Sequence, residues 1–262
     1  MATRRTKGIS VLDADPDLAV RLAPAALEAA RRHAVAPAVT VGLGHVDPAS
    51  WGATADGHLG FLVLSGLLTR SVTVLGRTSI ELVGAEDLLR PWEEGAEQAS
   101  VPRQVSWSVL EPAQVAVLDH RFARRVARWP EIGAALLDRT FRRVQRISFH
   151  VAILENPRVD VRLMLLFWQL ADQWGHVGPE GVTVPMRLTH EALGRLVRAQ
   201  RPSVTVSLRH LAERDLIRRD RDGWLLCGDV SEHLDALAAG SASAPAPRRL
   251  LSELPPRLPD PG

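Results

Sequence analysis

The stretch Leu188–Ile217, LTHEALGRLVRAQRPSVTVSLRHLAERDLI, predicts two short helices joined by a tight turn. Thr189 suits the N-cap of the first helix, because its hydroxyl can accept a backbone N–H at the helix start. The second helix is expected to begin near Arg201 and Pro202, since a proline in the first turn lacks only an N–H that would have no partner there. This order predicts a helix-turn-helix unit.

The second helix has two distinct faces. Val204, Leu208 and Leu211 recur at i, i+4 and i+7 and are expected to face the core. The opposite face carries small, polar and cationic side chains, which suit a helix lying in the major groove of DNA. The residues predicted to contact DNA, in this helix and at the start of the first, are Thr189, His190, Arg201, Pro202, Ser203, Thr205, Val206 and Arg209.

The flanking residues predict strands on both sides of these helices. Residues 182–188 alternate between apolar and polar side chains, the pattern of a short strand. Leu216-Ile217 begins a second strand, which Asp222-Gly223 turns into a third over residues 224–226. The whole is a winged helix-turn-helix, with an ordinary helical hairpin as the alternative. Residues 195–221 hold eight arginines against three acidic residues, which is typical of a phosphate-binding surface.

This stretch resembles the DNA-binding domain of the Crp/Fnr transcription regulators. That family has a threonine-led first helix with a glycine inside it, and a recognition helix of the form R-x-[ST]-V-x-x-x-L. The matching residues are Thr189, Gly194, Arg201, Ser203, Val204 and Leu208. The resemblance implies a DNA-binding regulator that binds a pseudo-palindromic operator as a homodimer, with RNA polymerase as a further partner.

Two residues depart from the family pattern. Arg198 stands in the turn where glycine is frequent, so strain is expected if the turn needs a positive φ. Val206 stands where a second arginine or a similar donor is frequent. Its methyl groups could contact a thymine methyl but cannot donate to guanine, so the base preference at this position is left open.

The N-terminal half predicts a β-rich domain after a helical lead-in. A helix is expected from Ala25 to His33, following Pro24. From residue 39 the pattern changes to short strands punctuated by glycines, at 39–41, 60–64, 67–74, 80–83, 105–107 and 115–118. This spacing predicts a sandwich or jelly roll, and the strand order resembles the cyclic-nucleotide-binding β-roll of the same family. The predicted fold class is α+β: this β-roll, a long dimerisation helix and the winged helix-turn-helix.

The segment that corresponds to the family's ligand pocket differs from the sensors of cyclic AMP. Those sensors carry a Gly-Glu turn and an Arg-Ser pair, which hold the ribose hydroxyl and the cyclic phosphate. Here residues 87–94, DLLRPWEE, lack the Gly-Glu step, and Arg103-Gln104 lies where Arg-Ser is expected. Arg103 is either a vestigial phosphate ligand or a solvent-facing arginine at a strand edge. Cyclic AMP is therefore not expected as a cofactor and the effector is unidentified; the candidate pocket residues are Arg90, Trp92, Arg103, Gln104 and Ser148.

Residues 120–157 predict the connection between the two domains. A short helix over 120–129 stops at Pro130, and a long helix follows to residue 156. The apolar seam of this long helix consists of Leu137, Val144, Ile147, Val151 and Leu154. A narrow seam on a long helix predicts a parallel coiled-coil homodimer; the alternative is a helix packed only on its own β-roll. A helix over residues 161–174 is expected to form the base of the winged helix.

The chain of 262 residues divides into four predicted segments. Residues 1–119 form the lead-in and β-roll, 120–157 the connecting helices, 158–230 the DNA-binding domain, and 231–262 a disordered tail rich in Ala, Ser and Pro. Cys227 is the only cysteine, which excludes a disulfide framework, a Cys-rich zinc site and a cysteine-ligated iron–sulfur cluster. The sequence shows neither a membrane span nor a signal peptide, so a soluble cytoplasmic protein without a membrane partner is expected.

No catalytic motif is present, so the chain is not expected to be an enzyme. The nine histidines are scattered singly, and neither a P-loop nor a Gly-x-Ser-x-Gly sequence occurs. One alternative is a cupin-like metalloenzyme with His45, His58 and Glu81 as ligands, although no His-x-His pair places two imidazoles on one strand face. The other alternative is a constitutive architectural DNA binder whose β-roll only dimerises.

Overall fold

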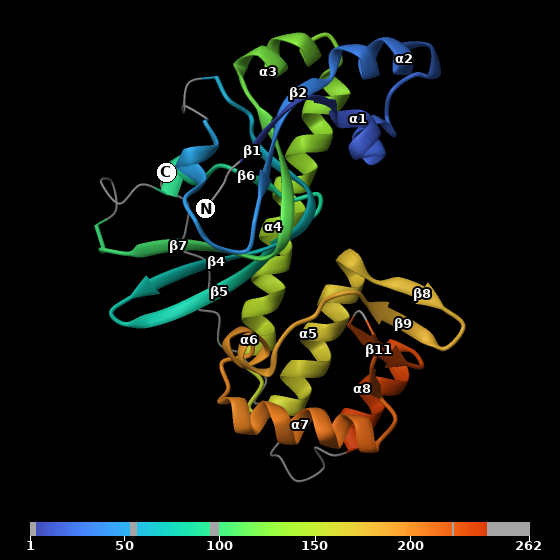
Figure 1. Ribbon diagram of the computed structural model, residues 1–262. Coiled ribbons are helices and arrows are strands. Elements are labelled where there is room, and N and C mark those ends of the chain that lie inside the picture. Colours follow the sequence, from blue (N-terminus) through green and yellow to red (C-terminus); the bar gives the residue numbers. More distant parts are fainter. Residues whose placement is uncertain (1–3, 53–56, 95–99, 222, 240–262) are drawn as a thin grey trace, which may run out of the picture.

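The computed structural model describes residues 4–52, 57–94, 100–221 and 223–239. A long helix, α4 (Pro130–Leu154), joins an N-terminal β-roll to a C-terminal winged-helix domain (Figure 1). The N-terminal elements are β1 (Arg4–Ser10), α1 (Val11–Ala14), η1 (Pro16–Ala19), α2 (Pro24–His33), β2 (Val35–Val41), β3 (Gly44–Val46), η2 (Pro48–Trp51), β4 (Gly60–Val74), β5 (Arg77–Gly84), β6 (Leu88–Leu89), η3 (Pro91–Glu94), β7 (Gln104–Leu118) and α3 (His120–Val126). The C-terminal elements are α5 (Val159–Trp174), β8 (His176–Gly178), β9 (Gly181–Val184), α6 (His190–Leu196), α7 (Arg201–Glu213), β10 (Ile217–Arg219), β11 (Trp224–Cys227) and α8 (Val230–Ala239). Within these described ranges, no helix has both the length and the apolar character needed to cross a membrane.

The β-roll is one antiparallel sheet with the strand order β1-β2-β7-β4-β5, to which β3 adds beside β7 and β6 beside β4. The sequence predicted two separate strands in each of the stretches that form β4 and β7. This prediction is wrong, because each is a single strand of 15 residues. β4 bends at Gly66, whose φ is +87° and where an added Cβ would lie 2.3 Å from the carbonyl oxygen of Pro112. The register with β7 shifts at this bend while the pairing continues.

Aromatic side chains fill the interior of the β-roll. Trp51 and Phe61 are 0% and 1% exposed, and their rings meet edge to face with centroids 5.0 Å apart. Trp92 of η3 packs edge-on against Phe61 at 5.5 Å, and Trp107 of β7 is buried in the same cluster. Large rings in these arrangements contribute most of the buried apolar area of a small core. The interior of this β-roll is therefore built around tryptophan and phenylalanine.

The N-terminal lead-in packs against the first turns of α4. Helices α1, α2 and α3 lie together at this end of α4 (Figure 1), and their shared core includes Leu12, Phe122 and Ile132. The predicted lead-in helix is confirmed as α2. Strand β1, which the sequence analysis did not predict, pairs with β2 and joins this lead-in to the edge of the sheet.

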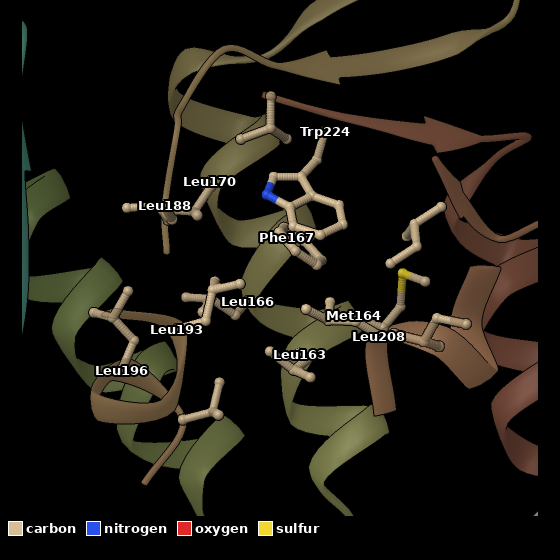
Figure 2. Packing of buried hydrophobic residues seen from close by; sticks show 14 of the residues in the cluster. Leu163, Met164, Leu166, Phe167, Leu170, Leu188, Leu193, Leu196, Leu208 and Trp224 are labelled. Carbon is tan, nitrogen blue, oxygen red and sulfur yellow. The ribbon is translucent and has the colours of Figure 1, made fainter. Parts of the chain in front are cut away.

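The winged-helix domain has one core between its helices and its sheet. The sheet order is β10-β11-β9-β8. Figure 2 shows Leu163 and Phe167 of α5, Leu193 of α6, Leu208 of α7 and Trp224 of β11 packed together. The rings of Phe167 and Trp224 lie 5.1 Å apart. The two predicted helices, their supporting helix α5 and the β10–β11 hairpin are thus confirmed.

Two details of the predicted wing differ from the structure. Strand β9 ends at Val184 and does not continue to Leu188, because Pro185 has no N–H to give to a neighbouring strand. Met186 and Leu188 enter the core instead. Strand β8 was not predicted and pairs with β9. Asp222, predicted to turn the hairpin, lies outside the described residues.

Residues 230–239 form helix α8, so the prediction of disorder from residue 231 is wrong for residues 231–239. Residues 240–262 lie outside the described part of the chain. His233 anchors α8 and is fully buried. The indole N–H of Trp168 donates to His233 Nδ1 at 3.0 Å, which leaves Nε2–H to donate to the Cys227 carbonyl at 2.5 Å. Composition could not reveal these long-range contacts.

Candidate DNA-binding interface

Helix α6 begins at the cap that the sequence predicted. The Thr189 hydroxyl accepts the backbone N–H of Ala192 at 3.1 Å, and so satisfies one of the N–H groups that a helix start leaves without a partner. Within α6, Gly194 lies against the following turn, where an added Cβ would be 2.7 Å from the carbonyl oxygen of Ala199. The absence of a side chain at Gly194 therefore allows the turn to fold back onto α6.

The turn between α6 and α7 contains Arg198, whose φ is +52°. The backbone N–H of Ala199 donates to the carbonyl of Gly194 at 2.8 Å and closes this turn. The turn therefore does need the positive φ that glycine would adopt freely. For an L-residue the left-handed conformation costs about 1–2 kcal/mol, so Arg198 stores strain at the entry to α7.

Helix α7 separates buried from exposed residues as the sequence predicted. Val204, Leu208 and Leu211 are buried, at 0%, 4% and 1% exposure. All residues of this helix that were predicted to face DNA are exposed: Arg201, Pro202, Ser203, Thr205, Val206 and Arg209. Exposure is what a recognition helix requires, and the individual DNA contacts remain predictions.

His190 links the start of α6 to α7. Its Nδ1 lies 2.9 Å from Thr205 Oγ1, and this hydroxyl donates to the backbone carbonyl of Arg201 at 3.0 Å. Because the single hydroxyl hydrogen is used there, Thr205 Oγ1 accepts the Nδ1–H of His190. His190 was predicted to contact DNA. The structure adds a second role, in which His190 holds the first turn of α7 against α6.

Two arginines on the exposed surface of α6 and α7 pair with glutamates of their own helices. Arg195 lies 2.5 Å from Glu191, and Arg209 lies 3.5 Å from Glu213. Exposed pairs of this i,i+4 type contribute only about 0.3–0.5 kcal/mol. Arg209 can therefore exchange Glu213 for a base edge at little cost.

The structure does not gather the predicted ligand-pocket residues into one site. The Arg90 guanidinium lies over the Trp92 ring at 5.8 Å, and Trp92 packs near the start of β4. Gln104 pairs with Thr73 at the far end of β4, next to the exposed Arg103. Ser148 is exposed on α4. Their correspondence with a family pattern suggested one pocket, and the length of β4 separates them.

The three residues of the metalloenzyme alternative also lie apart. His45 is exposed on β3, whereas His58 is buried beside the ring of Trp92. Glu81 of β5 is held by an arginine of α4. In the part of the chain that the structure describes, no group of three or more His, Cys, Asp or Glu side chains could hold a metal ion.

Helix α4 exposes an apolar stripe in the single chain. The side chains of this stripe are Leu137 (54%), Phe141 (58%), Val144 (55%), Ile147 (40%) and Val151 (54%), whereas Phe149 (47%) is exposed on the side of α4 that carries Arg142 and Arg146. Phe141 and Phe149 were not assigned to the seam from the sequence, and Leu154 is half-buried.

The arginines of α4 face the β-roll. Arg143 donates through Nε and Nη2 to the two carboxylate oxygens of Glu81, at 2.6 and 2.9 Å. One turn further along, Arg146 pairs with Asp87. Burial raises the pKa of the Asp87 carboxyl, and the charge of Arg146 opposes this effect. These pairs fix the β-roll to one side of α4 and leave Leu137, Val144 and Val151 of the seam exposed.

A buried ion pair joins α4 to the N-terminal lead-in. Arg139 is 3% exposed, and its Nη2 lies 2.7 Å from Asp15 Oδ1. Burial raises the pKa of Asp15 and lowers that of Arg139, while the charge of each partner opposes the shift of the other. Sequence reasoning missed this pair because its members lie 124 positions apart. A buried pair of this kind is strongly destabilising to break.

Comparisons with known proteins agree with this geometry. Residues 161–229 match the protein family described as the Crp-like helix-turn-helix domain. A CooA mutant from Carboxydothermus hydrogenoformans is 14% identical, with a TM-score of 0.56 over 90% of this chain and 97% of that one. A cyclic nucleotide-binding domain containing protein from Listeria monocytogenes EGD-e is 16% identical, with a TM-score of 0.57 over 72% and 87%. FixK2 from Bradyrhizobium japonicum is 12% identical, with a TM-score of 0.52 over 77% and 96%. No curated protein matches the chain significantly.

The exposed recognition helix, its wing and the matched domain define a winged-helix DNA-binding transcription regulator. Residues 161–229 are a Crp-like helix-turn-helix domain, and the order of β-roll, long helix and winged helix is the fold that the chain shares with the solved structures named above.

Proposed function

We propose that the chain binds a pseudo-palindromic operator as a homodimer, with α4 on the dimer axis and one α7 helix in each major groove. The observation that carries this proposal is the exposed apolar stripe of α4. The opposite side of the helix is already held to the β-roll by Arg143 and Arg146. A second copy of α4 is therefore the partner that the stripe fits.

The stripe is large enough to support a dimer. It runs from Leu137 to Val151, which is about 21 Å at 1.5 Å per residue. Complete burial of one large apolar side chain contributes about 1.5–3 kcal/mol. Apolar residues at heptad-like spacing on both copies would interlock along this length, as in a parallel coiled coil.

A two-fold axis along α4 determines how DNA is read. It places two α7 helices on the same side of the dimer, and the expected half-sites are about one helical turn, or roughly 34 Å, apart. In each half-site Arg201 and Arg209 would contact base edges, and Thr189, His190 and Ser203 would contact phosphates. A regulator bound in this way would act on RNA polymerase at a nearby promoter.

We further propose that DNA binding does not need cyclic AMP. Trp51 and Phe61 fill the β-roll, and Leu88 and Leu89 form the buried strand β6. Pro91, at the start of η3, has no N–H to offer a phosphate. Arg103 lies at the opposite end of β4 from this segment. These features support a β-roll whose pocket is filled by its own side chains. We propose no catalytic activity, since the matched domain is a Crp-like helix-turn-helix domain.

Selection of bound sequences from randomised DNA by the full-length protein, without added ligand, tests this function. A dyad-symmetric site is expected, with two protected stretches about one helical turn apart in hydroxyl-radical footprints. Sedimentation of the complex should give two protein chains per site. A lone asymmetric half-site with one chain bound would contradict the homodimer. Protection of all sequences alike would instead support the constitutive architectural binder.

A further inference from the structure

His150 of α4 lies at the junction of α4, α5 and α6. Its Nδ1 is 3.0 Å from Oε1 of Gln169 in α5, and its Nε2 is 3.1 Å from the carbonyl oxygen of Leu196, the last residue of α6. The Gln169 side chain is 8% exposed. One imidazole thus connects the proposed dimer helix to the first two helices of the DNA-binding domain.

A third contact fixes the orientation of the Gln169 amide. Its Nε2 donates to the backbone carbonyl of Arg146 at 2.7 Å. The reversed amide would place Oε1 against this carbonyl, with two acceptors at 2.7 Å and no proton between them. Oε1 therefore faces His150. Both ring nitrogens of His150 consequently face an oxygen that can only accept.

Only a doubly protonated imidazole satisfies both contacts. A neutral ring carries one N–H, and its other nitrogen is an acceptor, so one of the two contacts would set a lone pair against a lone pair. The Leu196 carbonyl also favours the cation, because the carbonyls at a helix C-terminus carry partial negative charge. The arrangement of His150, Gln169 and Leu196 is therefore that of an imidazolium.

Charged groups of the neighbouring elements line the same cavity of about 140 Å³ as His150. They are Arg70 of β4, Glu81 of β5, Arg146 of α4 and Arg198 of the α6–α7 turn. Arg143 binds Glu81, which also lies 3.6 Å from Arg70, and Asp87 binds Arg146. Two carboxylates of the β-roll, Glu81 and Asp87, thus face three arginines of β4 and α4. Arg198 adds one positive charge. The oxygen atoms of Gln169 in α5 and Leu196 in α6 face His150.

We propose that His150 is a positioning residue for DNA binding, and that its contacts are complete only when it is protonated. Leu196 ends α6, and the strained Arg198 turn leads from it into α7 at Arg201. The contact at Leu196 therefore fixes the point from which the recognition helix departs. The proposal rests on the proposed function, because the spacing of two α7 helices in a dimer depends on how each is held to α4.

The direction of the pH effect follows from the count of contacts. The imidazolium makes one hydrogen bond more than the neutral ring. The junction is therefore complete with the imidazolium and is one contact short with the neutral ring. Operator affinity is accordingly expected to fall as the pH rises.

Operator affinity at about pH 6 and about pH 8, at constant ionic strength, tests this expectation by fluorescence anisotropy. The variants His150→Gln and His150→Asn each keep one neutral donor and cannot titrate. The wild type should lose roughly three- to tenfold more affinity than either variant over this interval. His190→Gln is the matched control, since it removes a histidine from the DNA surface itself. The proposal is overturned if His190→Gln abolishes the pH effect and the His150 variants retain it.

A second measurement does not depend on DNA. In nitrogen NMR spectra of the full-length, histidine-labelled protein, the His150 signals are those lost in His150→Gln. Both ring nitrogens should carry protons at the pH where operator affinity is high, and one should have lost its proton at the pH where affinity is low. One unprotonated ring nitrogen at every pH would overturn the proposal. Arg201→Ala should weaken DNA binding at both pH values without moving these signals, so failure of the DNA interface and failure of this proposal are distinguishable.

Discussion

Asp87 of the β-roll and Arg146 of α4 form an ion pair in which the carboxylate is 1% exposed and the guanidinium 24%. The other carboxylate oxygen accepts the backbone N–H of Gly84 at 3.0 Å. Desolvation raises the pKa of Asp87 in spite of both contacts. This pair holds the turn after β5 against the proposed dimer helix, and the burial of its carboxylate costs free energy.

The raised pKa of Asp87 predicts how stability depends on pH. A carboxyl whose pKa is raised in the folded state contributes stability at low pH, and this contribution is lost as the pH rises through the folded value. Asp87→Asn removes the titration. The stability of the wild type relative to this variant should therefore fall from about pH 4 to about pH 7, as urea unfolding at a series of pH values would measure.

Asp160 provides a control of opposite sign. Burial raises its pKa, but the hydrogen bonds and charge of Arg158 outweigh burial and the net shift is downward. A carboxyl with a lowered pKa contributes stability at neutral pH that is lost as the pH falls. The stability of the wild type relative to Asp160→Asn should therefore fall as the pH drops below about pH 4. Trends of equal sign in the two variants would count against these assignments.

The strain at Arg198 predicts a stabilising substitution. Arg198→Gly should raise the free energy of unfolding by about 1 kcal/mol, because glycine adopts the observed φ without steric cost. Arg198→Ala is the control, since it removes the same side chain and keeps the Cβ. Thermal unfolding compares the two variants. If alanine stabilised the protein as much as glycine, the effect would come from the guanidinium and not from the backbone.

The winged helix could be predicted from the sequence because its signals are local. The Thr189 cap, Pro202 in the first turn of α7 and the spacing of Val204 and Leu208 each act within a few residues. The positive φ at Arg198 could be expected for the same reason, since a tight turn imposes its geometry on whichever residue occupies it.

The remaining features depend on contacts between distant residues. A glycine ends many strands, yet Gly66 only bends β4, because β7 continues to pair beyond it. Helix α8 forms where composition suggested disorder, since Trp168 and Cys227 both bind His233. The role of His150 likewise appears only when Gln169 is brought beside it. The periodicity of apolar residues predicts which face of a helix or strand is buried, but it does not predict which residues pack against that face.

The seam predicts a substitution that separates the two chains. Ile147→Asp places a carboxylate beside its own symmetry mate in the dimer. Burying charge there costs on the order of several kcal/mol. The variant should sediment as a monomer and lose operator binding while its far-UV spectrum stays that of the wild type. Ala152→Asp adds the same charge to an exposed position off the seam and should remain dimeric. A dimeric Ile147→Asp would show that α4 packs only within its own chain.

The exposed face of α7 predicts a loss of base discrimination. Arg201→Ala should cost roughly 1–3 kcal/mol on the selected operator and relax the preference at one base pair. Arg77→Ala removes the same charge from the exposed start of β5 and should leave affinity within error. Binding to a panel of single-base operator variants measures both effects. Equal losses for Arg201→Ala on all operators would assign Arg201 to a phosphate instead.

The filled β-roll predicts that cyclic AMP does not bind. A cyclic phosphate needs an anion cradle, and an unpaired ribose hydroxyl would cost roughly 1–3 kcal/mol on burial. Trp51 and Phe61 would have to leave the core to make room. Each loss of about 1.4 kcal/mol weakens binding tenfold, so affinity should be at least about two orders of magnitude below micromolar.

Calorimetry should give no binding heat at micromolar nucleotide, with operator DNA titrated into the same protein as the positive control. Arg103→Ala should behave like the wild type in both titrations; micromolar binding that this substitution abolished would restore a cyclic-nucleotide sensor.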